Sequence, residues 1–423
     1  MKFLWISMLM NMVLFCQLYG QSIPANYDEG KVPDYHLPDP LLFKNGKLVR
    51  EPSDWEKRRG ELLSIFEQEV YGISPNWDGK MHHEILSVDE EFLGGTAIRK
   101  EIKLTLEKEG NSISMNVLIF LPHSRQKVPA FMGLNFYGNH TLAKDTLVQI
   151  PTSWIRDNEA MGSSSNRASS KGRGKRIPNW PYQEILSRGY GLITLYYGDI
   201  DPDFDDGFEN GIHQVMGHNG RPDAWGSIAA WGWGLSRVMD YLENEPGINS
   251  EKVAILGHSR LGKAALWAGA LDERFALVIS NNSGCGGAAL SRRQYGETIG
   301  RINTAFSHWF ADNFNKYNQK ETQSPIDQHQ LLALMVPRPV YVASGEDDRW
   351  ADPRGEFLSC VAASPVYQLL GLEGMPQKEI PGANQPVMGT IGYHIRTGGH
   401  GLLGYDWEQY LQFADMHFDL VGD

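Results

Sequence analysis

A serine in a glycine-flanked turn is the residue of this sequence most clearly placed for chemistry. Residues 257–263 read GHSRLGK, an apolar run at 253–256 precedes them, and an Ala- and Leu-rich segment, 263–271, follows. A buried strand, a tight turn and a helix in this order hold a serine hydroxyl clear of a sheet. The N-terminus of that helix offers unpaired N–H groups to a developing oxyanion. We therefore expect Ser259 to act as a nucleophile.

The turn is one residue longer than the usual nucleophile pattern. The common motif is G-x-S-x-G, whereas Gly257, Ser259 and Gly262 form G-x-S-x-x-G. A Gly-Ser pair at a strand end is often an ordinary turn, so the motif alone leaves both interpretations open. The strand and helix that flank the turn favour the catalytic one.

A nucleophilic serine needs a base, and in this chain order the base should come last. His394, His400 and His417 lie in the final part of the sequence. His400 lies in a glycine-flanked loop, TGGHG, that is able to bring an imidazole against the serine. His394 lies in a strand-like stretch and His417 on an amphipathic helix, where structural roles are more common. We expect His400 to be the base.

The acid that orients the base is expected in a loop after a late strand. The buried strand at 339–344 is followed by GEDDRWADP, residues 345–353. The spacing G-x-x-D favours Asp348 over its neighbour Asp347 as the triad acid. A run of three acidic residues is also typical of a solvated loop, and that alternative stays open here.

Short buried strands alternate with helices through most of the chain. The pattern begins with an antiparallel hairpin, 96–106 and 112–121, in which apolar residues alternate. Later strands are expected at 128–136, 191–197, 253–256, 275–280 and 339–344, and helices at 182–188, 225–242, 263–271, 330–335 and 407–418. This order predicts an α/β-hydrolase fold, a three-layer αβα sandwich with a mostly parallel central sheet. The loop at 133–140 follows a strand at its carboxyl end, so it would either form a wall of the site or be a glycine-rich loop with ordinary packing.

A helix is expected at 53–71, before the sheet begins. Ser53 and Glu56 form a capping box, and Gly72 ends the segment. Its apolar residues repeat at helical spacing: Trp55, Leu62, Leu63, Phe66 and Val70. The Pro- and Asp-rich residues 21–52 are expected to wrap the surface.

The N-terminus has the layout of a secretory signal peptide. Leu4–Phe15 is an apolar run after Lys2 and is too short to span a bilayer. We expect residues 1–20 to be removed and the protein to be exported, periplasmic or secreted, without membrane contact after cleavage. A short N-terminal membrane anchor is the alternative.

The remaining residues, 21–423, suit a single α/β-hydrolase domain with two loop insertions. One insertion, around 157–178, is rich in Ser, Gly and Arg, and the other, around 199–221, is rich in Asp and Gly. The first has no apolar period, so we expect an exposed loop that forms a functional rim or a disordered excursion. The second is its acidic counterpart.

Charge and cysteine content restrict the possible partners. A formal net charge of −12 argues against nucleic acid. No Cys/His cluster has zinc-site spacing and no Gly-rich phosphate loop is present, so we expect neither metal nor cofactor. Outside the leader the chain has only Cys285 and Cys360, which is no disulfide framework, and spacing does not tell whether they pair.

The motifs resemble those of bacterial glucuronoyl esterases, carbohydrate esterase family 15. The family's turn pattern, G-x-S-R-x-G-K, accounts for the extra residue in 257–263. The resemblance extends over residues 50–420 and includes SGCGG at 283–287, Asn303-Thr304, HWF at 308–310, WADP at 350–353 and the glycine-flanked His400.

The resemblance implies a serine esterase that cleaves the ester between 4-O-methyl-glucuronic acid of glucuronoxylan and lignin alcohols, or methyl and benzyl esters of the same acid. Ser259 would attack the ester carbonyl and His400 would relay the proton. Arg260 would stabilise the oxyanion. The substrate-binding residues would be Lys263, Glu297, Trp350 and Asn303.

One departure from the family pattern concerns the triad acid. Many members carry a glutamate where this sequence has Asn282, and asparagine cannot stabilise an imidazolium as a carboxylate would. We therefore predict a triad of Ser259, His400 and Asp348. An acetyl-xylan or other carbohydrate deacetylase of the same fold, and a weakened relative that binds glycan without cleaving it, are the alternatives. A monomer is the default expectation.

Overall fold

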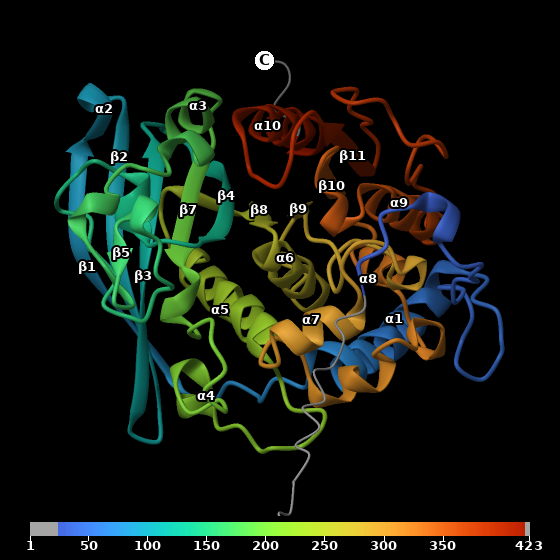
Figure 1. Cartoon of the computed structure of the whole chain (residues 1–423). Coiled ribbons are helices and arrows are strands. Elements are labelled where there is room, and N and C mark those ends of the chain that lie inside the picture. The colour runs from blue at the N-terminus through green and yellow to red at the C-terminus, as the bar shows by residue number, and fades with distance from the viewer. Residues whose placement is uncertain (1–23, 419–423) are drawn as a thin grey trace, which may run out of the picture.

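The computed structural model describes residues 24–418, and its central feature is one twisted sheet of nine strands (Figure 1). The strand order is β1-β2-β3-β7-β4-β8-β9-β10-β11. The first three strands and β7 pair antiparallel, and every pairing from β7 to β11 is parallel. The predicted leader, residues 1–20, lies outside the described residues.

The bounds of the strands follow the alternation of apolar residues closely. The sheet consists of β1 (Lys80–Glu91), β2 (Ala97–Lys108), β3 (Asn111–Pro122), β4 (Val128–Asn135), β7 (Gly191–Tyr196), β8 (Ile248–His258), β9 (Leu277–Asn281), β10 (Val340–Gly345) and β11 (Ile391–Arg396). Strands β4 and β7 are buried along their whole length, as parallel strands covered on both faces must be.

Helices cover the sheet on two faces and create two separate cores (Figure 1). One face packs against α1 (Pro52–Phe66), α5 (Ser227–Leu242), α6 (Arg260–Leu271), α8 (Gln328–Ala333) and α9 (Pro353–Leu369). The other face packs against α3 (Tyr182–Ser187) and α10 (Gly404–Phe418). This is the expected α/β-hydrolase sandwich.

The parallel strands bring the predicted catalytic residues to one edge of the sheet. Ser259 follows β8, Asp348 follows β10 and His400 follows β11. Because parallel strands end at the same edge, three loops far apart in sequence converge there. The loop after β9, which begins at Asn282, lies between them.

Two local predictions were wrong in detail, and two elements were not predicted. Helix α1 begins after Glu51 with Pro52 at its first position and has no capping box at Ser53, because proline already suits the first turn. The last predicted turn, Glu67–Tyr71, is π-helical. Strand β1 and helix α9 were not predicted; β1 is mostly exposed and therefore lacks a strong apolar alternation.

The two predicted insertions are not loose excursions within the described chain. The first contains a two-stranded ribbon, β5 (Ser163–Ser164) and β6 (Arg167–Ala168), and short helical turns. The second contains α4 (Gly211–Met216) and buries the acidic side chains of Asp201 and Asp203. Their composition resembles that of solvated loops, but these carboxylates are held by internal partners.

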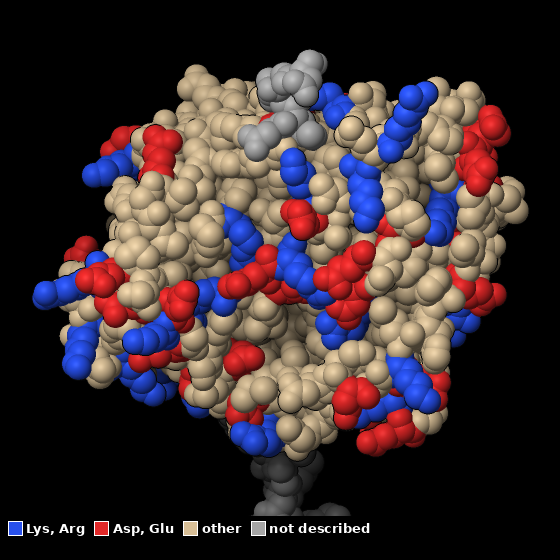
Figure 2. Space-filling model, turned by 180° about the vertical axis from the view of Figure 1, so that it is seen from behind, with Lys and Arg blue, Asp and Glu red and all other residues tan. Residues whose placement is uncertain are grey.

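Charged side chains of both signs are interspersed on the face opposite to that of Figure 1 (Figure 2). Lys and Arg alternate with Asp and Glu across its middle, so the acidic excess of the chain is not gathered into one patch there. Among residues 24–418, no helix is both long and apolar enough to cross a bilayer.

Candidate active site

The serine lies in a strained turn between β8 and α6. Ser259 has φ 57° and ψ −129°, a backbone conformation that residues other than glycine rarely adopt. Its N–H donates to the carbonyl of Asn281 at 2.9 Å, which ties the turn to β9. A Cβ on Gly257 would lie 1.9 Å from the carbonyl oxygen of Leu261, so only glycine lets the turn close.

The spacing of the second glycine also has a physical reason. A Cβ on Gly262 would lie 3.0 Å from both the carbonyl oxygen of Gly257 and the Cβ of Ser283. The longer G-x-S-x-x-G motif therefore places a glycine where the first turn of α6 packs against the loop after β9. In that first turn the N–H groups of Gly262 and Lys263 donate to the carbonyl of Ser259 at 2.9 and 3.3 Å. The N–H groups of Arg260 and Leu261 are left at the serine end of the helix.

His400 and Asp348 are joined by a short hydrogen bond. His400 Nδ1 lies 2.6 Å from Asp348 Oδ2, and the amide of Asn282 donates to the same oxygen at 2.8 Å. Burial raises the pKa of Asp348, but the hydrogen bonds from His400 and Asn282 outweigh it, and the net pKa lies below the usual range. Asp348 is buried, whereas Asp347 is exposed. Asp348, and not Asp347, is therefore the carboxylate that contacts His400.

The predicted base also contacts the ring of a neighbouring histidine. The ring of His258, the residue before the serine, packs against His400 with ring centroids 4.4 Å apart. Burial and the adjacent His400 lower the pKa of His258 to about 3. His258 is therefore neutral at ordinary pH and supports the base without repelling it.

A buried arginine that was not predicted holds the loop of His400. Arg396 at the end of β11 donates to the carbonyls of Gly399 at 2.9 Å and Gly401 at 2.7 Å, one on each side of His400. Its Nε pairs with Asp406 at 3.0 Å. A lone arginine at a strand end gives no sequence signal for this role.

Arg260 is fixed by a carboxylate from the second insertion. Its guanidinium donates to Asp203 and lies over the Trp309 ring, 4.8 Å from the centroid. Asp203 also accepts from His308 at 3.0 Å, from Trp309 at 2.8 Å and from Tyr197 at 3.0 Å. Burial raises the pKa of Asp203, but these partners and the charge of Arg260 hold it well below its usual range. The pair gives the site a fixed cation next to the serine.

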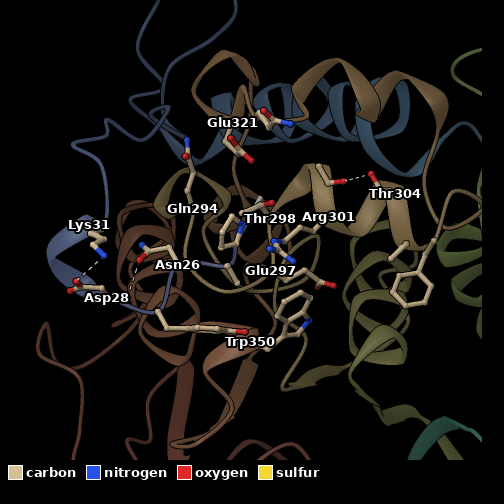
Figure 3. A pocket seen from close by; sticks show the side chains of 17 residues that line it. Asn26, Asp28, Lys31, Gln294, Glu297, Thr298, Arg301, Thr304, Glu321 and Trp350 are labelled. Carbon is tan, nitrogen blue, oxygen red and sulfur yellow. Dashed lines mark hydrogen bonds and ion pairs between the residues drawn. The ribbon is translucent and has the colours of Figure 1, made fainter. Parts of the chain in front are cut away.

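Lys263 and Glu297 form a buried pair behind the serine. Lys263 donates to the carbonyl of Ser283, and its Nζ lies 3.8 Å from Glu297 Oε2. Burial lowers the pKa of Lys263 and raises the pKa of Glu297. Glu297 lines a pocket of about 1260 Å³ together with Trp350, whose side chain is 40% exposed (Figure 3).

Comparison with known proteins places the chain in a family. A family model described as glucuronyl esterase of fungi matches residues 209–371. A carbohydrate esterase of an unknown prokaryotic organism is 48% identical over 412 residues, which cover 95% of this chain and 94% of that protein. A 4-O-methyl-glucuronoyl methylesterase of Phanerochaete carnosa is 28% identical over 365 residues, 84% of this chain and 77% of that protein.

Solved structures agree with the sequence comparison. A glucuronoyl esterase from Solibacter usitatus shares 45% identity at a TM-score of 0.86, over 92% of this chain and all (100%) of that one. A promiscuous esterase of carbohydrate esterase family 15 from a marine bacterial metagenome shares 47% identity at a TM-score of 0.88, over 93% and 100%. The chain belongs to the glucuronoyl esterases of carbohydrate esterase family 15. It is a carboxylic ester hydrolase, as the sequence motifs predicted.

Of the four residues expected to bind substrate in this glucuronoyl esterase, Glu297 and Trp350 line the pocket, whereas Lys263 and Asn303 do not. Asn303 lies apart. It is on α7 (Ile299–Ala305), is buried, and donates to the side chain of Asn318 at 2.8 Å. It does not line the pocket within the described chain, although its neighbours Thr298, Gly300 and Thr304 do. Its position favours a structural role.

The glucuronoyl esterase also has a buried carboxyl group beneath the loop after β9. Glu356 on α9 accepts from the N–H of Gly284 at 3.0 Å and from the hydroxyl of Ser344 at 2.6 Å. Burial raises the pKa of Glu356 to about 8. Glu356 thus supports the loop that carries Asn282 and the carbonyl that receives Lys263.

Two expectations concern cysteines and metals. Cys285 and Cys360 are both buried and unpaired, so no disulfide joins the loop after β9 to α9. Among residues 24–418, no group of His, Cys, Asp and Glu side chains is arranged to hold a metal ion.

Proposed function

We propose that this family member hydrolyses the ester between 4-O-methyl-glucuronic acid of glucuronoxylan and lignin alcohols, through a triad of Ser259, His400 and Asp348. The observation that carries the proposal is the 2.6 Å contact of His400 with a buried Asp348, together with a serine held at positive φ. These residues come from the three loops at one edge of the sheet. In this proposal Ser259 is the nucleophile, His400 the base and Asp348 the acid that orients the base.

The reaction proceeds in two halves. Ser259 Oγ attacks the ester carbonyl while His400 Nε2 takes its proton, and the imidazolium is stabilised by Asp348. His400 then protonates the leaving alcohol, which departs and leaves an acyl-enzyme. Water attacks this ester in the second half, with His400 again as the base, and the uronic acid and free serine are released.

Arg260 and the first backbone N–H groups of α6 supply the oxyanion site in this proposal. Asp203 fixes Arg260 in position before substrate arrives, so little reorganisation accompanies the reaction. Glu297, Trp350 and the Lys263 ammonium behind them are proposed to receive the uronate ring, with the indole as an apolar platform.

Export is part of the same proposal. Plant polysaccharide lies outside the cell, and the apolar run at 4–15 is typical of a signal peptide. We propose that residues 1–20 are removed, that 21–423 form one catalytic domain, and that the exported protein acts as a monomer.

The test compares hydrolysis of benzyl glucuronate with release of acetate from an acetylated sugar. We expect turnover of the uronate ester in the wild type and none in Ser259→Ala. Acetate release without uronate cleavage would assign the protein to the deacetylases. Absence of turnover on both esters would favour the glycan-binding alternative, and ordinary turnover by Ser259→Ala would exclude the mechanism.

A further inference from the structure

The first insertion carries positive charges that its surroundings do not neutralise. Residues 144–178 include seven Lys and Arg side chains and three acidic ones. Arg156 reaches Asp203 at 3.9 Å, and Asp145 pairs with the buried Arg99 at 2.9 Å. This leaves six cations, here called the basic rim, against two acids. The acids are Asp157 and Glu159, and the basic rim consists of Lys144, Arg167, Lys171, Arg173, Lys175 and Arg176.

Within residues 24–418, no member of the basic rim forms an ion pair with a carboxylate. Elsewhere the chain pairs its arginines with acids, as in Arg293 with Asp352 at 2.8 Å and Arg221 with Asp223 at 2.7 Å. A chain with a formal net charge of −12 has acids in excess. Cations that nevertheless stay unpaired in one segment can accommodate a counter-charge from outside the chain.

The basic rim is held in place by contacts that leave its charge intact. Arg173 donates to the carbonyls of Asp145 at 2.6 Å and Thr146 at 3.2 Å, and Lys175 donates to that of Ala160 at 2.6 Å. Carbonyl groups are neutral, so these bonds order the cations without neutralising them. The other exposed members are Lys144, Arg167 and Lys171.

The basic rim borders the candidate active site. Its last member, Arg176, lies over the ring of Tyr137 in the loop after β4, 5.5 Å from the centroid. Three residues later Asn179 donates at 2.7 Å to the carbonyl of Leu402, in the loop that carries His400. The charge of Arg176 also reaches the ring beside His400, because it adds to burial and to His400 in lowering the pKa of that histidine, His258. An anionic polymer on the basic rim would therefore lie next to the catalytic residues.

The reaction of the proposed function supplies an anion of matching charge. Hydrolysis of a uronate ester leaves a carboxylate on the polysaccharide, and uronic acids that carry no ester are carboxylates already. Such a polymer is repelled by a protein of negative net charge. Salt screens exposed charges beyond about 8 Å, so cations at the place of contact can offset this repulsion. Arginine binds carboxylates through its forked donors and lysine as a point charge.

Resting on the proposed function, we propose that the basic rim binds free carboxylate groups of an acidic polysaccharide and keeps the enzyme on that polymer. The basic rim is separate from the pocket of Glu297 and Trp350, because none of its six residues lines that pocket. The groups bound are unesterified, so binding requires neither Ser259 nor turnover. Nucleic acids and polyphosphates are the competing polyanions.

The experiment measures how polygalacturonate, a polymer of free uronates, retards the exported protein in native gels. We expect retardation of the wild type at about 0.02 M salt, a much weaker effect at about 0.2 M, and none in gels that contain neutral xylan. The apparent dissociation constant follows from the dependence of mobility on polymer concentration.

Two triple variants that remove equal charge separate the basic rim from the net charge of the protein. Loss of three exposed members of the rim should raise the apparent dissociation constant about tenfold or more, since each exposed charge contributes up to about fivefold. Loss of three exposed lysines on or near α1 and after α9 should change it by less than about twofold. The rim variant is Lys144→Ala/Arg167→Ala/Lys171→Ala, and the matched control is Lys47→Ala/Lys57→Ala/Lys378→Ala.

Failure of this proposal differs from failure of the proposed function. Absence of benzyl glucuronate cleavage by the wild type would refute the proposed function, whereas the gel measurement needs no turnover and would still test the basic rim. An unretarded wild type, or equal retardation of the two triple variants, overturns the binding surface. Stronger retardation by DNA or polyphosphate than by polygalacturonate would assign the rim to phosphate and overturn its assignment to carboxylates.

Discussion

Asn282 donates its amide to the same Asp348 oxygen that contacts His400. Asn282 occupies the position at which many relatives are expected to carry the acid, so the two acid positions of the fold lie within hydrogen-bond distance. In this chain one position holds the carboxylate and the other holds a donor that orients it. The departure noted in the sequence is therefore compensated locally.

Replacement of Asp348 by asparagine should reduce kcat by about 10⁴-fold, because the imidazole would adopt the wrong tautomer and its charged form would lose its counter-ion. Steady-state kinetics on benzyl glucuronate measures the loss. Asp347→Asn is the matched control, since Asp347 is exposed and its backbone N–H, not its side chain, contacts Gly398. A large loss in the Asp347→Asn control instead would mean that Asp347, and not Asp348, is the triad acid.

The donor at position 282 can be tested separately. Asn282→Ala removes one hydrogen bond to a charged acceptor, worth about 1.5–3 kcal/mol, so kcat should fall by roughly tenfold to a hundredfold. Asn282→Asp should instead change the pH dependence of kcat/KM. Two carboxylates in contact raise the pKa of one of them, so the acid limb of the kcat/KM profile should move to higher pH. An unshifted limb would mean that the two side chains do not interact.

The loop of His400 should depend on Arg396. Arg396→Lys keeps the positive charge near Asp406 but loses the forked donation to Gly399 and Gly401. Since a misplacement of about 1 Å costs on the order of 10²-fold, kcat should fall by about that factor while KM changes little. A loss of folded protein would also lower the apparent kcat without changing KM, so circular dichroism and thermal unfolding must show that the variant is folded. A folded Arg396→Lys variant with an unchanged kcat would contradict this role.

Asp203 should make the free energy of unfolding depend on pH. Its pKa is lowered in the folded state, so its stabilising contribution is complete above the unfolded pKa near 4 and is lost as pH falls toward the folded value. Asp203→Asn leaves Arg260 without its counter-charge and should reduce the free energy of unfolding by up to about 3–5 kcal/mol at pH 7. Urea unfolding from pH 3 to 7 should show the wild type approaching the variant at the acid end. A difference in the free energy of unfolding between wild type and variant that stays the same from pH 3 to 7 would contradict this expectation.

Asn303 tests the limits of family resemblance. Because its amide bonds Asn318 and does not line the pocket, Asn303→Ala should leave KM for the uronate ester within about twofold and cost about 1 kcal/mol of stability. Urea unfolding and steady-state kinetics check both numbers. A large rise in KM with unchanged stability would restore its expected contact with substrate.

The fold was predictable because its signals are local. Buried runs such as 253–256 and 339–344 are typical of strands covered on both faces, and the order of strands and helices then favours a parallel sheet. The serine turn was predictable for the same reason, since Gly257 and Gly262 are required by backbone approaches that a Cβ would block. The positions of Asp348 and His400 follow from where parallel strands end.

The supporting residues could not be predicted, because their partners are distant in sequence. Asp203 lies in an acidic stretch whose composition suggests solvent exposure, and only tertiary packing brings it to Arg260 and His308. Glu356 is likewise an ordinary helical glutamate until the loop after β9 folds over it. Composition describes a segment's average environment, and these side chains are exceptions within their segments.

The neutral ring of His258 beside His400 affects how many protons the site takes up. Two facing imidazoles that both carried a proton would repel each other, because their like charges would lie in direct ring contact. With the pKa of His258 lowered to about 3, it binds no proton in the range where a histidine ordinarily titrates. Mild acid therefore places no positive charge on the ring that faces His400.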